Sequence, residues 1–187
     1  MGIRNLFAKR TENVVTGTKV LVAFLDPKFA ELARADCRCY SQFYPATNNA
    51  EELLEAIKGY DVVHLFSDVT KDGNITDSRG REITATRLMQ SCCDADVKLL
   101  WLASENKPEG YIKGFKAGGK PLNLVLTIDR KGSHFSGFLE NILRKMSTGE
   151  TMPSAWVALA PQNSNDARNQ DAPACIFAAG RGGARLR

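Results

Sequence analysis

The sequence predicts an α/β fold with a mainly parallel central sheet of about five to six strands, flanked by helices. The first observation behind this prediction is that short apolar runs alternate with capped or amphipathic segments along the chain. The second is that two of the runs, residues 61–66 and 97–103, are almost continuously apolar. Such runs are typical of strands buried on both faces of a parallel sheet, in which helices connect one strand to the next.

The apolar runs predict the strands of the sheet. In chain order they cover residues 19–25, 39–44, 61–66, 97–103, 122–128 and 175–179. The segments between them predict the helices, over residues 27–35 and 51–57, after residue 84, around residues 111–115, and over residues 135–146 and 153–159. Several of these helices begin at residues that favour N-caps, namely Asp26 followed by Pro27, Asn48 or Asn49, and Thr84.

A small β-hairpin is predicted between the third strand and the helix that follows it. Its signals are the turn dipeptides Asp72-Gly73 and Arg79-Gly80, which surround Ile75 and Ile83. We therefore divide the chain into three parts. These are a polar lead-in over residues 1–16, an α/β domain over residues 17–161, and a C-terminal part over residues 162–187 with a polar loop, a last short strand and an Arg/Gly-rich tail.

The composition is that of an ordinary soluble globular protein, with 43% hydrophobic and 25% charged residues. The net charge of +4 is small, and we interpret the basic residues near both ends as solvated termini rather than a nucleic-acid surface. No apolar run approaches the roughly 18 residues of a membrane-spanning helix. The first residues also lack an apolar region of signal-peptide length. We expect a cytoplasmic protein without a membrane or nucleic-acid partner.

The cysteines and histidines predict neither disulfides nor a metal site. There are five cysteines, an odd number, and two histidines, His64 and His134. Neither histidine stands at a zinc-ligand spacing from the cysteines. We expect structural thiols, no metal and no cofactor. His64, inside a predicted strand, is expected to be a core histidine hydrogen-bonded to the backbone.

Open α/β sheets place their ligand sites just past the carboxyl ends of the strands. The polar residues at these ends are therefore the candidate site. They are Asp26, His64, Ser67, Asp68, Ser104, Glu105 and Lys131.

The order of elements resembles that of the CHAT domain, a member of the caspase-like cysteine peptidase clan. The resemblance rests on a third strand with His64, the hairpin, the helix opening Ile83–Leu88 and the strand Lys98–Leu102. It continues through residues 114–129, the helix with its glycine turn at 135–149 and the final helix at 152–159, and it covers about residues 18–161. The resemblance implies a caspase-like sheet.

The resemblance also implies that the catalytic pair has been lost. The family's catalytic histidine is the second in a segment of the form apolar, His, three residues, His-Gly. Here His64 matches the first histidine, Asp68 stands in place of the second, and Val69 replaces the glycine. The family's cysteine ends the next central strand, where Ser104 or Glu105 stands. A thiolate nucleophile needs a neighbouring imidazole, so we expect no cysteine peptidase activity.

These observations predict a pseudo-peptidase domain that acts as a binding or regulatory module. CHAT domains usually occur in bacterial multi-component systems, so the resemblance implies a protein or peptide partner. Carboxylates at Asp68 and Glu105 would favour a basic ligand. The sequence leaves the oligomeric state open.

Three alternatives remain. A peptidase with a non-standard site could use Asp68 and Glu105 as two carboxylates that share a proton and activate water. A receiver-like phosphoacceptor could use Asp68 as acceptor, with Asp26, Ser104 and Lys131 around it. A phosphate site could form at residues 180–183, although this glycine-rich segment lacks the lysine of a nucleotide-binding loop.

Overall fold

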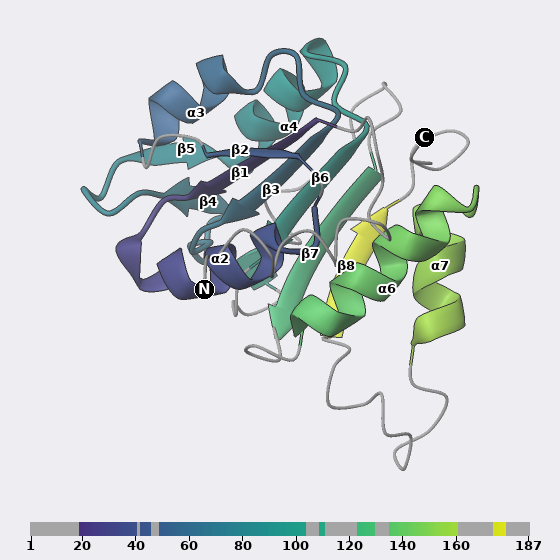
Figure 1. Ribbon diagram of the computed structural model, residues 1–187. Coiled ribbons are helices and arrows are strands. Elements are labelled where there is room, and N and C mark those ends of the chain that lie inside the picture. The colour runs from purple at the N-terminus through teal and green to yellow at the C-terminus, as the bar shows by residue number, and fades with distance from the viewer. Residues whose placement is uncertain are drawn as a thin grey trace, which may run out of the picture.

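The structure, a computed structural model, describes residues 19–40, 42–45, 49–103, 109–110, 123–129, 135–160 and 174–178. Its centre is a six-stranded sheet of order β2-β1-β3-β6-β7-β8 (Figure 1). The strands are β1 (Val20–Phe24), β2 (Phe43–Pro45), β3 (Val62–Phe66), β6 (Leu99–Ala103), β7 (Asn123–Asp129) and β8 (Ala174–Ala178). The first five are mutually parallel and β8 runs antiparallel to β7. The predicted α/β class with a mainly parallel sheet is confirmed.

Helices cover both faces of this sheet. They are the short 3-10 helix η2 (Pro27–Phe29), α2 (Ala30–Cys37), α3 (Ala50–Ala56), α4 (Ala85–Asp94), α6 (Phe135–Ser147) and α7 (Met152–Leu159). Helices α2, α6 and α7 pack on one face, and α3 and α4 pack on the other (Figure 1). Every residue of β3 and β6 is buried, which explains why these two strands are apolar without a polar face.

The capping residues explain where several helices begin. Four N-cap residues have extended backbone angles, and their side chains accept hydrogen bonds from backbone N–H groups in the first helical turn. They are Asp26, Asn49, Thr84 and Thr151. These bonds satisfy donors that would otherwise have no partner inside the helix. The caps at Asp26, Asn49 and Thr84 confirm the sequence prediction.

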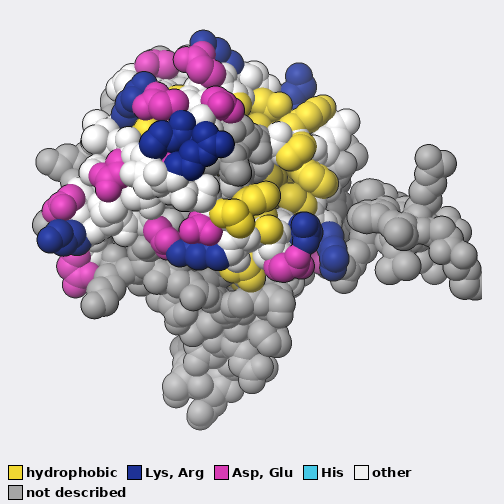
Figure 2. All heavy atoms as spheres, turned by 90° about the vertical axis from the view of Figure 1, so that its left-hand side faces the viewer, with side chains coloured by type: hydrophobic (Ala, Val, Ile, Leu, Met, Phe, Trp, Pro, Cys, Tyr) yellow, Lys and Arg dark blue, Asp and Glu magenta, His cyan; other side chains and the backbone are white. Residues whose placement is uncertain are grey.

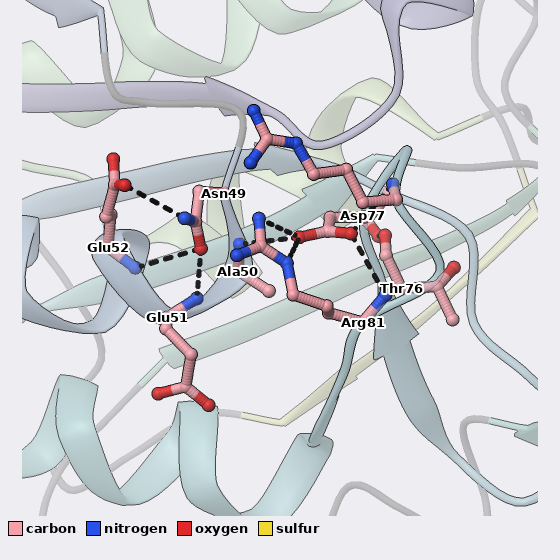
Figure 3. Close-up of polar contacts among 9 residues, drawn as sticks. Asn49, Ala50, Glu51, Glu52, Thr76, Asp77 and Arg81 are labelled. Atoms are coloured by element: carbon pink, nitrogen blue, oxygen red, sulfur yellow. Dashed lines mark hydrogen bonds and ion pairs between the residues drawn. The ribbon is translucent and has the colours of Figure 1, made fainter.

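The predicted hairpin is confirmed as β4 (Asn74–Thr76) and β5 (Glu82–Thr84), paired antiparallel with Ile75 opposite Ile83. Both isoleucines are buried against the α3 and α4 side of the sheet. The turn of the hairpin is held by Asp77, whose carboxylate accepts hydrogen bonds from the backbone N–H groups of Ala50, at 3.3 Å, and Arg81, at 3.0 Å (Figure 3). The hairpin is thereby attached to the first turn of α3.

The second strand differs from the prediction over residues 39–44. The structure begins β2 at Phe43, because Cys39 and Tyr40 belong to the turn that closes α2. Their N–H groups donate to the carbonyls of Asp36, at 2.9 Å, and Cys37, at 3.2 Å. Their apolar side chains are buried beside the sheet rather than within it. The helix predicted around residues 111–115 lies outside the described residues.

Candidate functional site

The carboxyl ends of β1, β3 and β6 lie side by side at one edge of the sheet. Phe24 pairs with Phe66, which in turn pairs with Ala103, so the three strands end in register (Figure 1). The chain leaves β1 towards β2 on one side and returns through β3 on the other side of β1. The gap between β1 and β3 is therefore a topological switch point, the place where open α/β sheets bind their ligands.

Asp26 and Asp68 flank this switch point, and Lys28 connects them. The Asp26 carboxylate accepts a hydrogen bond from the backbone N–H of Lys28 at 2.9 Å, as the N-cap of η2. The side-chain ammonium of Lys28 forms an ion pair with the Asp68 carboxylate, and both side chains remain about half exposed. The negative charge that the sequence places at Asp68 is thus already paired within the chain.

Ser67 lies between β3 and Asp68 but is fully buried. Its hydroxyl lies 2.8 Å from the carbonyl oxygen of Thr76 and 3.1 Å from that of Asp68. These contacts attach the end of β3 to the hairpin. The part of Ser67 in binding a ligand stays a prediction.

Gly110 approaches the loop that follows Asp68. A Cβ atom on Gly110 would lie 2.5 Å from the carbonyl oxygen of Thr70 and 3.0 Å from Cγ1 of Val69. Only glycine fits such a close approach of two backbones. This contact was not predicted, because a single glycine in a sequence does not reveal the distant segment that it packs against.

His64 lies in the middle of β3 and is buried, as predicted. The sequence predicted a hydrogen bond to the backbone, whereas the structure shows the ring beside polar side chains. Its Nδ1 lies 2.7 Å from the hydroxyl oxygen of Tyr40, and its Nε2 lies 3.5 Å from Oδ2 of Asp36. The Ser136 hydroxyl donates to the other carboxylate oxygen of Asp36 at 2.7 Å. Of these residues, only His64 was a predicted candidate. Asp36 could have been noticed, since it follows Phe29 and Ala33 along the buried side of α2.

The described thiols are poor candidates for a nucleophile. Burial, and secondly the charge of Asp36, raise the pKa of Cys37 to about 12. Burial, and secondly Cys93, raise the pKa of Cys92 far above its ordinary value. Cys37 and Cys39 lie at the end of α2 and just after it, and Cys92 and Cys93 lie on α4. None of these four free thiols follows a strand of the sheet.

In the described part of the chain, no group of three His, Cys, Asp or Glu residues could hold a metal ion.

An exposed aromatic surface lies at the β2 edge of the sheet. Phe43 is 45% exposed and Tyr44 is 42% exposed, although both are large hydrophobic side chains. Tyr44 also packs edge-on against Tyr60, with 5.4 Å between the ring centroids. Figure 2 faces the side of the molecule on which α3 and the hairpin lie, and shows hydrophobic side chains gathered in one band with charges of both signs beside it. We call Phe43, Tyr44 and Tyr60 the edge aromatics.

The remaining candidate residues, Ser104, Glu105 and Lys131, lie outside the described residues, as does His134. The predicted approach of Asp68 and Glu105 therefore stays a prediction.

Comparisons with protein-family models, curated proteins and solved structures give no match for this chain. Among the described helices, none is both long and apolar enough to cross a membrane.

Proposed function

We propose that this chain is a catalytically inactive CHAT-like, or pseudo-peptidase, domain that binds a protein or peptide partner and regulates a bacterial multi-component system. One observation carries the proposal. In the resemblance to the CHAT domain Asp68 takes the place of the catalytic histidine, and the Asp68 carboxylate is paired with Lys28. A carboxylate next to a thiol would disfavour the thiolate by like-charge repulsion, so this position cannot activate a cysteine nucleophile.

The architecture supports the same proposal. A hairpin directly follows β3, and the sheet is mainly parallel with helices on both faces. The strand ends keep the position of a ligand site while Asp68 and Lys28 supply charged groups for recognition. The edge aromatics support a protein partner, because aromatic side chains are enriched at protein interfaces and exposed apolar patches mark binding surfaces.

A basic peptide is the ligand that suits this site. Its lysine or arginine would replace Lys28 as the partner of Asp68, so Lys28 competes with the ligand. An exposed ion pair contributes about 0–1 kcal/mol, and displacing Lys28 is therefore inexpensive.

Binding of short peptides, measured by fluorescence anisotropy, tests the proposal. Peptides with a central Arg are expected to bind more tightly than the same peptides with a central Glu. Mass spectrometry of the bound peptides is expected to show no cleavage. Asp68→Asn should weaken binding of the Arg peptides about tenfold, since a charge-assisted hydrogen bond is lost. Lys28→Ala should tighten it by up to about fivefold, because the competing ammonium is removed.

Glu55→Gln is the matched control. Glu55 lies on α3, away from the strand ends, and forms an exposed ion pair with Lys58. Removing its negative charge should leave peptide binding unchanged. Equal affinity of the Asp68→Asn variant and the wild type for the Arg peptides would refute a site at Asp68. Peptide hydrolysis would favour the non-standard peptidase, and hydrolysis that is lost on Cys→Ala replacement would refute the inactive domain.

A receiver-like phosphoacceptor is the second candidate. The observation in its favour is that Asp26 and Asp68 flank the switch point of a sheet whose first five strands have the doubly wound order 2-1-3-4-5. Incubation with acetyl phosphate and Mg²⁺, followed by intact mass measurement, separates the two candidates. The pseudo-peptidase proposal expects no phosphoryl adduct. An adduct on the wild type that is absent from the Asp68→Asn variant would establish the receiver instead.

A further inference from the structure

The polar cluster around His64 lies inside the core, away from the strand ends. Asp36 and His64 are both fully buried, and Tyr40 is 7% exposed. The imidazole stacks on Phe66, with 4.9 Å between ring centroids and 8° between ring planes, and on Trp101, at 5.7 Å and 23°. The imidazole is therefore packed against two aromatic rings, and both ring nitrogens face oxygen atoms.

The cluster joins three elements that are far apart in the sequence. Asp36 and Tyr40 come from α2 and the turn after it, His64 from β3, and Ser136 from the first turn of α6. Among the described residues, Cys37 and Cys39 also bring titratable thiols to the cluster, and Cys39 donates to the carbonyl oxygen of Ser136 at 3.2 Å. From β6, the packed group is the indole of Trp101, which does not titrate.

Charge balance favours a proton on both ring nitrogens of His64. A buried carboxylate is costly unless a positive group lies beside it, and Oδ2 of Asp36 lies 3.5 Å from Nε2. An imidazolium would donate from Nε2 towards Asp36 and from Nδ1 to the oxygen of Tyr40. Burial, and secondly the charge of Asp36, raise the pKa of Tyr40 well above its ordinary value, so its hydroxyl stays neutral and its oxygen can accept.

We propose that His64 is held as an imidazolium between Asp36 and Tyr40, and that this buried ion pair is a pH-sensitive tether between α2, β3 and α6. The tether goes beyond the binding function and does not depend on it. Lys28 lies in η2, directly before α2, and Asp68 follows β3. The tether between α2 and β3 therefore also joins the two elements that carry the Lys28–Asp68 ion pair.

The direction of the pH effect follows from proton linkage. An unfolded histidine loses its proton near pH 6.5, whereas the tether keeps the proton in the folded protein above that pH. Folding then takes up a proton above about pH 6.5, and the free energy of unfolding falls as the pH rises. The unfolding equilibrium constant should increase about tenfold per pH unit until the folded His64 also loses its proton. Cys37, with a pKa of about 12, stays protonated in this range.

The ¹⁵N chemical shifts of the imidazole nitrogens test the proposal directly. The chain has two histidines, so His134→Gln in the full-length protein leaves His64 as the single labelled imidazole. At pH 7.5 we expect both His64 nitrogens to have imidazolium shifts. The shift pattern of a neutral imidazole at this pH would overturn the proposal.

Two variants separate the tether from a general role in packing. Asp36→Asn should give neutral His64 shifts at pH 7.5, because the carboxylate that holds the proton is gone. Tyr40→Phe keeps Asp36 and should keep the imidazolium shifts, even where the protein becomes less stable. Imidazolium shifts that persist in Asp36→Asn would overturn the assignment to Asp36. If Asp36→Asn does not fold, two measurements on the wild type decide: the His64 nitrogen shifts, and the change of the free energy of unfolding with pH between pH 6 and 8.5. If the free energy of unfolding of His64→Gln changed with pH as steeply as that of the wild type, the tether would be contradicted.

Discussion

Replacing Asp77 with asparagine is expected to lower the free energy of unfolding by about 2 kcal/mol, because N–H donors around this buried carboxylate lose their acceptor. The Asp77 side chain is fully buried, whereas that of Arg81 is 39% exposed, and Oδ2 of Asp77 lies 2.8 Å from Nη2 of Arg81. Its Oδ1 also accepts from the backbone N–H groups of Arg79, at 2.9 Å, and Arg81, at 3.0 Å. An asparagine amide can accept only through one oxygen, so some of these donors lose their acceptor.

Urea unfolding followed by circular dichroism measures this effect. The control is Glu31→Gln, which removes one carboxylate from an exposed ion pair with Arg34 and should change stability by less than about 1 kcal/mol. A loss from Asp77→Asn as small as that of the control would show that the hairpin does not depend on this carboxylate.

The acid stability of the protein should depend on the same residue. Burial alone would raise the pKa of Asp77, but hydrogen bonds from the backbone of Arg81, Ala50 and Arg79 and from the Arg81 side chain outweigh it and lower that pKa. A lowered carboxyl pKa contributes stability above the unfolded value of about 3.9, which is lost as the pH falls through the folded value. In Asp77→Asn, the free energy of unfolding should therefore fall less on acidification than it does in the wild type.

Replacing Trp101 with alanine is expected to cost about 4 kcal/mol, because it opens a large cavity in the centre of the sheet. The side chain is fully buried. Its ring lies 5.4 Å from that of Phe135 and 5.8 Å from that of Trp156, measured between centroids. These contacts connect β6 to α6 and α7, so the cavity would border three elements.

Trp101→Phe should cost much less, about 1–2 kcal/mol, since a ring still fills most of the space. The indole N–H of Trp101 has no hydrogen-bond partner within the described part of the protein, and phenylalanine removes this buried donor. Val157→Ala, at a side chain that is 62% exposed on α7, is the control and should stay within about 0.5 kcal/mol. Equal losses for the alanine and phenylalanine variants would contradict the cavity argument.

The sequence was sufficient to predict the elements whose signals are local. The strands β3 and β6 are apolar because both faces are covered, with His64 the one polar residue of β3, and the hairpin is marked by two glycine turns. The caps at Asn49 and Thr84 follow from the side chains of those residues alone. The strand expected at Cys39 and Tyr40 was misplaced, because an apolar residue that packs beside a sheet has the same local pattern as one within it.

The polar contacts of the site and the core could not be predicted in the same way. Lys28 pairs with Asp68 across 40 positions, and Ser136 bonds to Asp36 across 100. Such partners are set by the order of strands and the packing of helices, which only the assembled fold determines. The sequence therefore predicted the strand ends at which Asp26 and Asp68 stand, but it did not reveal that Asp68 already has a partner.

The close approach of Gly110 to Thr70 couples the segments that follow β3 and β6. There is no room for a methyl group between the two backbones, so we expect a shift of Thr70 towards Gly110 to require Gly110 to move as well. Thr70 is two residues from Asp68, so a ligand that displaces the loop at Asp68 would transmit its motion to the chain beyond β6. We therefore expect a ligand at the end of β3 to change the position of Gly110, which the chain reaches after β6.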